Sequence, residues 1–316
     1  MTGLLDAAAT VYGLGWELRR RLYARGVLRP SRVPARVVSI GNLTVGGTGK
    51  TTLTLHLGKR LVARGIDVAV VCRRYRPGPR GIGDEEQMYV DAFGRARVLA
   101  GTRKRDLAWQ AADEGRTAIL VDDGFSHWAL ERDVNLVTID ALDPWGGGKL
   151  LPAGRLREPR RALQRADAVV LTRLDAALDP EPLLESIARA APAARLACGR
   201  HRVVGVRALD GAPATAASRI WLVTATGNPL AVERSAREAG LEVAGGSRYR
   251  DHHWFSAAEA RGEHVRARAA GAALLITAKD AVRWPRAAAE GVLVLEVAWE
   301  WVQGGAAIES MVEGAS

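Results

Sequence analysis

The sequence predicts an α/β protein: a P-loop-containing, parallel-sheet α/β/α domain followed by a second, smaller α/β domain. Short apolar runs rich in Val and Ile alternate with segments long enough for crossover helices, as in sheets buried on both faces. A glycine-rich loop stands between the first such run and a helical pattern. The chain of 316 residues is also about twice the length of a typical domain.

The elements of the larger domain follow in order along the chain. Residues 1–30 have the periodicity of an amphipathic helix, and arginines cluster near its end. Residues 36–43 form a β-rich run, and residues 50–64 predict a helix with leucines on one face. Further strands are predicted at residues 68–72, 117–121, 135–139 and 168–171.

A second set of elements begins near residue 219. Strands are predicted at residues 220–224, 274–277 and 292–297, with a helix at residues 230–239. The preceding stretch, residues 202–218, is rich in Ala, Gly and Pro and is the expected boundary. We therefore predict a kinase-type domain over residues 1–205 and a smaller domain over residues 206–316.

Composition excludes several classes of protein. With 48% hydrophobic and 25% charged residues, the chain is neither disordered nor collagen-like nor a coiled coil. No apolar stretch approaches the ~20 residues that cross a bilayer, and we expect no signal peptide. Cys72 and Cys198 stand far apart without a CxxC pair, so we expect neither a disulfide framework nor a zinc ribbon. A reducing cytoplasm fits this pattern.

The net charge of +10 favours an anionic partner: nucleic acid, phospholipid or a phosphorylated substrate. Residues 1–30 offer two interpretations of this charge. They could form an interfacial membrane anchor, with Tyr12, Trp16 and Tyr23 at headgroup depth and arginines on anionic lipid. Alternatively, the same helix packs on its own domain. The pattern alone leaves both open.

The glycine-rich loop predicts a phosphate site. Glycines let backbone N–H groups surround a phosphate, the following helix adds a favourable dipole, and Lys50 reaches the β- and γ-phosphates. Thr44 stands where the strict P-loop pattern has glycine, so the match is incomplete at its first position. The predicted nucleotide-binding residues are Thr44, Val45, Gly46, Gly47, Thr48, Gly49, Lys50, Thr51 and Thr52.

Two carboxylates, Asp122 and Asp123, end the apolar run at residues 118–121 as a Walker B element does. Together with the Thr51 hydroxyl, they are the predicted Mg²⁺ ligands. An ordinary acidic turn remains the alternative for this pair taken alone. Residues 172–175 are similar to the guanine-reading box of GTPases, with Arg173 in place of lysine. A P-loop GTPase or metallochaperone-type NTPase therefore stays open as the alternative function.

Several blocks, in order, resemble the tetraacyldisaccharide 4′-kinase family, the lipid A 4′-kinases. The blocks are residues 39–51, 83–85, 122–127, 151–159, 227–229, 251–253 and 277–280. The resemblance implies an enzyme that moves the γ-phosphoryl of ATP to the 4′-hydroxyl of a tetraacylated glucosamine disaccharide 1-phosphate, with Mg²⁺. It also implies two α/β/α domains, the smaller one closing the active-site cleft.

The resemblance assigns roles by position. Lys50 would bind phosphate, Asp84 would be the base, and His252 would pair with Asp84, while Arg157 and Glu158 match a conserved pair near the site. Arg73 and the cluster at residues 103–105 match further basic positions of the family pattern. A sugar hydroxyl is a poor nucleophile, so a carboxylate that accepts its proton makes chemical sense.

The implied partners are a lipid A disaccharide precursor and, through residues 1–30, anionic lipid. We accordingly expect a peripheral protein at the cytoplasmic face of the bacterial inner membrane, without an obligate protein partner. A nucleic-acid-binding protein would need aromatic platforms among its arginines, and the sequence has no such interleaving. We expect no nucleic-acid partner.

The sequence departs from the family pattern at several positions. Arg74 stands where glycine is usual, Glu86 where proline is common, Ser126 where glutamine is usual and Ala278 where glutamate is common. None of these residues belongs to the phosphate-binding loop. We therefore expect them to bear on acceptor specificity and not on phosphate binding.

Overall fold

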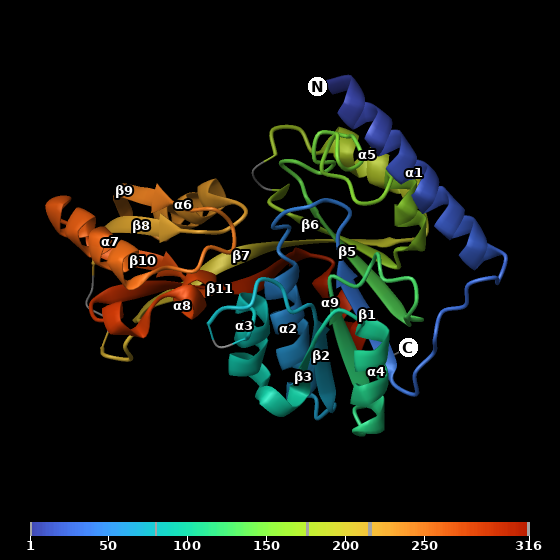
Figure 1. Cartoon of the computed structure of the whole chain (residues 1–316), viewed down its shortest axis with the longest axis horizontal. Helices are drawn as coiled ribbons and strands as arrows, with labels where there is room; N and C mark the ends of the chain where they lie inside the picture. The colour runs from blue at the N-terminus through green and yellow to red at the C-terminus, as the bar shows by residue number, and fades with distance from the viewer. Residues whose placement is uncertain (1, 80, 175–176, 214–216, 315–316) are drawn as a thin grey trace. The chain divides into compact units, whose positions relative to one another are not determined.

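The structure, a computed structural model, describes residues 2–79, 81–174, 177–213 and 217–314. These residues form two compact units (Figure 1). The first unit takes its residues from 1–73, 92–200 and 301–316, and the second from 74–91 and 201–300. The chain thus enters the second unit near the boundary expected from composition, but residues 74–91 also belong there and residues from 301 onward return to the first unit.

The first unit is built on parallel strands. They are β1 (Arg36–Gly41), β2 (Val68–Cys72), β3 (Val98–Ala100), β4 (Ala118–Asp122), β5 (Val134–Asp140), β6 (Ala168–Thr172) and β7 (Arg195–Ala208), whose residues from 201 onward belong to the second unit. Their order is β3-β2-β4-β1-β5-β6-β7, and each neighbouring pair is parallel. The expected parallel α/β sheet is confirmed. The short β3 was not predicted, because three residues carry too little pattern.

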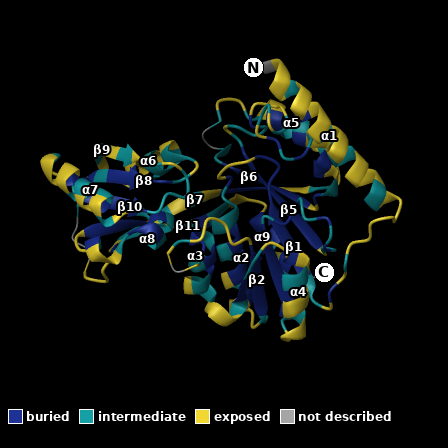
Figure 2. Ribbon diagram, viewed as in Figure 1, coloured by how far each residue is buried: buried dark blue, intermediate teal, exposed yellow. Residues whose placement is uncertain are grey.

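Helices cover both faces of these strands. They are α1 (Thr2–Ala24), α2 (Lys50–Ala63), α4 (Lys104–Asp113), α5 (Glu181–Ala190) and α9 (Gly305–Glu313), with 3-10 turns at Arg95–Arg97 and Arg160–Arg165. Gly58 of α2 lies against Leu120 of β4, whereas Ala108 and Ala111 of α4 pack in a cluster with Ile119 from the opposite face of the same strand. Figure 2 shows the strands as the buried centre of the unit.

Burial explains why α2 is held firmly behind the glycine-rich loop. Its residues Leu53, Leu57 and Leu61 are each no more than 1% exposed. Burying one such side chain contributes about 1.5–3 kcal/mol, so the three together anchor the helix by several kcal/mol. The loop that precedes α2 therefore has a fixed support.

The second unit also has a parallel sheet. Its strands are β8 (Arg219–Thr224), β9 (Glu242–Arg248), β10 (Ala273–Thr277) and β11 (Val292–Gln303), in the order β11-β10-β8-β9. Its helices are α3 (Asp84–Phe93), whose last two residues belong to the first unit, α6 (Pro229–Glu238), α7 (Ala257–Ala269) and α8 (Ala278–Arg283), with a 3-10 turn at Arg286–Ala288. The core includes Val223, Ile276, Phe255 and Trp284. The carboxyl ends of β8, β9 and β10 lead into the segments that carry the polar cluster described below.

Candidate active site

The glycine-rich loop leaves the carboxyl end of β1 and is tied to its surroundings on both sides. The Asn42 side chain donates from Nδ2 to the carbonyl of Thr44 at 2.7 Å. The hydroxyls of Thr48 and Thr138, the latter on β5, lie 2.7 Å apart in a hydrogen bond. These bonds fix both ends of the loop before any ligand binds.

Helix α2 begins directly at the end of this loop. Gly49 precedes it with φ of 88°, a left-handed conformation that a side chain would strain. Lys50 and Thr51 belong to the first turn, whose backbone N–H groups lie at the positive end of the helix dipole. A glycine-rich loop followed by such a turn is suited to bind phosphate, as the sequence predicts.

Asp123, the second acid after β4, is held by Arg157. The guanidinium donates two hydrogen bonds, of 2.7 Å to Oδ2 and 2.6 Å to Oδ1, and also contacts the side chain of Asn42. Burial alone would raise the pKa of Asp123, but the charge and hydrogen bonds of Arg157 lower it well below its usual range. Asp123 is therefore ionised, and its φ of 52° shows that this turn takes a strained form.

Lys104 holds the same turn from inside the unit. This lysine is only 5% exposed, and its Nζ donates to the carbonyl oxygens of Asp122 at 2.5 Å and Asp123 at 2.8 Å. Burial lowers the pKa of Lys104, while the two aspartates oppose that shift. The three basic residues at positions 103–105 thus differ in burial. Lys104 is buried, whereas Arg103 and Arg105 pair with Asp106 and have exposed side chains.

Sequence reasoning missed a second set of contacts on the segment that follows Asp123. Arg132 donates to three backbone carbonyls within residues 124–127, and Arg165 stacks on the rings of Phe125 and Trp128 at 4.3 and 4.0 Å. Glu158 is 2% exposed and pairs with Arg165. The Arg157 side chain therefore faces Asp123, whereas the Glu158 side chain faces this supporting cluster. Only the tertiary fold brings these arginines together.

A donor set suited to Mg²⁺ is present in the first unit. Thr51 lies in the first turn of α2, Asp122 is the last residue of β4, the strand next to β1, and Asp123 follows it. Among the described residues, no three His, Cys, Asp or Glu side chains gather closely enough to form a complete metal cage. Mg²⁺ does not require one, since it is usually bound by one or two carboxylates together with substrate phosphates and water.

The strand ends beyond β1 carry the residues similar to a guanine-reading box. Arg173, which follows β6, has φ of 58° and pairs through its guanidinium with Asp140 at the end of β5. Asp175 of that box lies outside the described residues. The arginine that replaces lysine is thus engaged by a neighbouring carboxylate.

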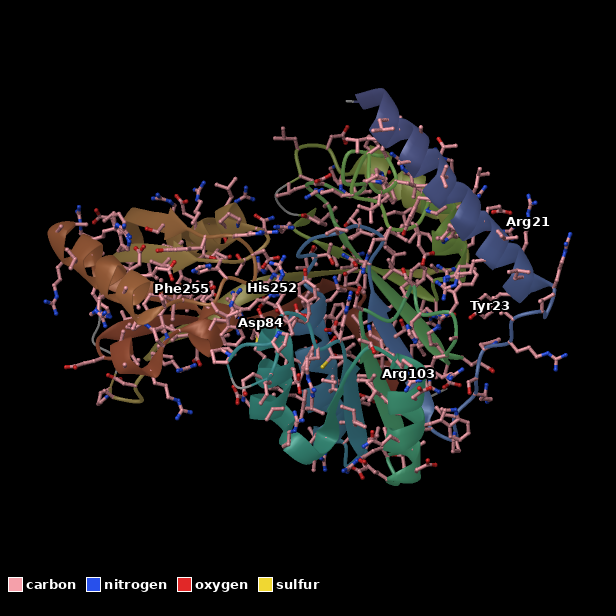
Figure 3. The ribbon with its side chains drawn as sticks, in the orientation of Figure 1. Arg21, Tyr23, Asp84, Arg103, His252 and Phe255 are labelled. Atoms are coloured by element: carbon pink, nitrogen blue, oxygen red, sulfur yellow. The ribbon has the colours of Figure 1, made fainter. Side chains whose placement is uncertain are left out.

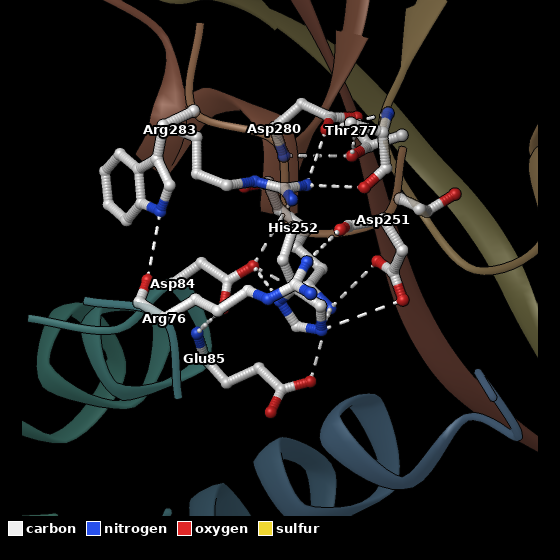
Figure 4. A network of polar contacts seen from close by, with 12 residues as sticks. Arg76, Asp84, Glu85, Asp251, His252, Thr277, Asp280 and Arg283 are labelled. Carbon is white, nitrogen blue, oxygen red and sulfur yellow. Dashed lines mark hydrogen bonds and ion pairs between the residues drawn. The ribbon is translucent and has the colours of Figure 1, made fainter. Parts of the chain in front are cut away.

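In the second unit, Asp84 and His252 meet although 168 positions separate them in sequence (Figures 3 and 4). Asp84 begins α3, and His252 follows β9. The Asp84 Oδ2 lies 2.9 Å from Nδ1 of His252, and its Oδ1 accepts from the backbone N–H of Glu85 at 2.9 Å. The predicted pair therefore forms.

The charge of Asp84 is set by its neighbours. Burial alone would raise the pKa of Asp84, but the hydrogen bond from His252, followed by the charges of Lys279 and Arg283, lowers it to about 2. Arg283 is fully buried and pairs with Asp280 at 2.6 Å. Asp84 is thus a carboxylate throughout the neutral range.

Two departures from the family pattern occur together in this unit. Arg74 donates to Glu86 through Nε at 3.0 Å and through its terminal nitrogen at 3.1 Å. Glu86 is fully buried. Because a buried carboxylate needs a partner, the arginine at the usual glycine position and the glutamate at the usual proline position compensate each other.

Helix α1 has two different faces. On one, the rings of Trp16 and Tyr23 pack against Trp128, and the Tyr12 hydroxyl donates to the Arg157 carbonyl at 2.8 Å. Trp16 and Tyr23, expected at headgroup depth, are thus packing residues of the first unit. Another face exposes an apolar stripe, Leu4, Val11, Leu14 and Leu18, each at least 60% exposed. None of the described helices has the length and hydropathy of a membrane span.

Comparison with known proteins identifies the family. A family model described as tetraacyldisaccharide-1-P 4′-kinase (LpxK) matches residues 1–314. The chain belongs to this family. A tetraacyldisaccharide 4′-kinase of Anaeromyxobacter dehalogenans is 38% identical over 94% of this chain and 86% of its own length. Another, of Geobacter metallireducens, is 34% identical over 89% and 88%.

The fold agrees with a solved structure. The crystal structure of LpxK from Aquifex aeolicus in complex with ATP matches with a TM-score of 0.74 at 22% identity, over 98% of both chains. The tetraacyldisaccharide 4′-kinase function predicted from the sequence, an ATP-dependent step of lipid A biosynthesis, is confirmed. The GTPase or metallochaperone alternative is not favoured.

Proposed function

We propose that this kinase binds MgATP at residues 44–52 and transfers its γ-phosphoryl to the 4′-hydroxyl of a lipid A disaccharide precursor. The observation that carries the proposal is the loop that leads into Lys50 at the start of α2, beside the strand that ends in Asp122 and Asp123. Lys50 would neutralise charge on the transferred group. Thr51 and the two aspartates would hold Mg²⁺, which supplies further charge neutralisation when bound.

Arg157 and Glu158 would act differently in this scheme. Arg157 touches Asp123 directly, so we assign it the orientation of that acid. Glu158 pairs with Arg165 and lies near the indole nitrogen of Trp128, so we assign it a supporting role for the loop after β4. Removal of Arg157 should then change the response to Mg²⁺, whereas removal of Glu158 should chiefly lower stability.

The pair in the second unit would act on the acceptor. Asp84 is ionised at neutral pH and can accept a hydrogen bond from a sugar hydroxyl, with His252 fixing its orientation. In phosphoryl transfer, positioning of the hydroxyl matters more than basicity, because the proton leaves late when the transition state is loose. A carboxylate with a low pKa is compatible with that role. We propose that both units serve one reaction.

We also propose peripheral attachment to the cytoplasmic face of the inner membrane through α1. The stripe formed by Leu4, Val11, Leu14 and Leu18 is apolar, and Arg21 next to it is exposed (Figure 3). Apolar burial together with attraction to anionic lipid gives interfacial binding. The acceptor is itself a lipid, so attachment would bring the enzyme to its substrate.

Two experiments test the proposal. Mass spectrometry of the disaccharide 1-phosphate precursor after incubation with MgATP should show addition of one phosphoryl group, and Lys50→Ala should abolish most of it. Sedimentation with anionic vesicles should show binding that weakens with salt and is lost in Leu14→Gln/Leu18→Gln. Leu230→Gln, on an exposed apolar residue of α6, is the matched control. Unphosphorylated acceptor, or undiminished vesicle binding by the double variant, would count against the respective assignment.

A further inference from the structure

The block at residues 277–280 contains a lysine that the scheme above leaves without a task. Lys279 follows β10 at the start of α8, and its side chain is 20% exposed. Its Nζ lies 3.5 Å from Nε2 of His252 and 3.8 Å from Oδ2 of Asp84. It therefore contacts both members of the pair at once, from a third segment of the second unit.

The contacts define where the protons of the pair lie. An ionised carboxylate only accepts hydrogen bonds, so Nδ1 of His252, 2.9 Å from Asp84, must carry a hydrogen. The lone pair of a neutral ring is then on Nε2, which faces Nζ of Lys279 at 3.5 Å and Oδ2 of Asp251 at 3.7 Å. An ammonium has three donors and no acceptor, so its place beside Nε2 favours this tautomer.

Lys279 also balances a group of negative charges. Besides Asp84, its Nζ faces Oε1 of Glu85 at 3.3 Å and Oδ1 of Asp251 at 3.8 Å. Arg283 faces Asp84 at 3.5 Å from the same helix, but it is fully buried and engaged by Asp280. Without Lys279, three carboxylates would share a small space beside Arg283 and beside Arg76, whose guanidinium donates to the carbonyl of Asp251 at 3.3 Å.

We propose that Lys279 is a positioning residue that fixes the tautomer of His252 and keeps Asp84 able to accept the proton of the acceptor hydroxyl. This inference rests on the proposed role of the Asp84–His252 pair. Lys279 acts through that pair and does not itself exchange a proton with the substrate. Its loss should therefore lower kcat at neutral pH and move the acid limb of kcat, and leave the binding of ATP by the first unit unchanged.

The test measures kcat against pH for the full-length chain with MgATP and the disaccharide acceptor. Lys279→Met keeps the length of the side chain but removes the charge. We expect kcat at pH 7 to fall by about tenfold to a hundredfold and the low-pH limb of kcat to move up by about one unit, since nearby carboxylates lose a cation. The KM for ATP should change less than about twofold.

Two comparisons separate this role from a structural one. Lys279→Arg retains the charge and should keep the position of the limb, and Lys59→Met, on an exposed lysine of α2, should behave as wild type. In Lys279→Ala, added ethylammonium should restore part of the lost kcat, which simple destabilisation would not allow. Lys279→Gln provides the same comparison should Lys279→Met fail to fold.

The outcomes also distinguish this inference from the proposed function. The first case assumes that Asp84→Asn is inactive. If Lys279→Met then leaves the low-pH limb of kcat unmoved and amines do not rescue Lys279→Ala, the role of Lys279 is overturned. Full turnover by Asp84→Asn would overturn the role of the pair itself, and the role of Lys279 with it. A moved limb with amine rescue, beside an inactive Asp84→Asn, would support both.

Discussion

The buried Lys104 gives a quantitative prediction about the first unit. Lys104→Met removes two charge-assisted hydrogen bonds, to the carbonyls of Asp122 and Asp123, and keeps an apolar stem of similar length. A hydrogen bond to a charged group contributes about 1.5–3 kcal/mol. Met also avoids the cost of burying an ammonium, the same burial that lowers the pKa of Lys104. The two bonds together contribute about 3–6 kcal/mol, and the avoided burial of the ammonium offsets part of this, so the net loss of unfolding free energy should be about 3 kcal/mol.

The loss should appear as a lower melting temperature. For a unit of about 200 residues, each 1 kcal/mol shifts Tm by roughly 2–4 °C, so Lys104→Met should melt roughly 6–12 °C below the wild type. Circular dichroism measures this shift, and Arg103→Met is the matched control because its side chain is 82% exposed and pairs only with Asp106 among the contacts described. Equal melting temperatures of Lys104→Met and Arg103→Met would refute the reasoning. The Mg²⁺ concentration for half-maximal activity should also rise, since the two acids lose their backbone support.

Three further predictions concern the proposed site. Lys50→Ala should lower kcat about 10²–10³-fold, because one electrostatic contact to the transferred phosphoryl is lost; an unchanged melting curve is the control, and near-normal turnover would contradict the phosphate role. Arg157→Gln should cost about 1.5–3 kcal/mol in urea unfolding, since the partly exposed Asp123 would lose its charge-assisted hydrogen bonds; a loss below about 1 kcal/mol would be inconsistent with that contact. The pKa of Asp84 falls from 3.8 to about 2 on folding. It therefore contributes about 2 kcal/mol above pH 4 that disappears as the pH falls from about 4 to about 2. The stability difference between wild type and Asp84→Asn should shrink over that window, and a constant difference would disprove the linkage.

Much of the first unit was predictable because its signals are local. The buried strands β1, β2, β4, β5 and β6 are runs of apolar residues, and the loop before Lys50 has a composition that few other structures share. The acids after β4 were found from their position at a strand end. Parallel strands place such ends at one edge of the sheet, so these short patterns sufficed to predict that the loop and the two acids follow neighbouring strands.

Contacts between distant segments were not predictable in the same way. The pair of Arg74 and Glu86 looks like two unrelated departures from a pattern until the structure joins them. Lys104 lies between two arginines in sequence, and it differs from them only because it lies on the buried face of α4. The family resemblance supplied Asp84 and His252, but neither pattern nor spacing indicated Lys279 as their neighbour.

The order in which the chain visits its units bears on how the protein folds as it is synthesised. Helix α9, near the end of the chain, returns to α2: Glu309 pairs with His56 at 2.9 Å, and Glu313 pairs with Arg60 at 2.5 Å. About 250 residues separate these partners, so the nucleotide-binding unit cannot be completed until nearly the whole chain has left the ribosome. Contacts of such long range slow folding. The face of α2 that carries His56 and Arg60 therefore lacks these partners until α9 has been synthesised.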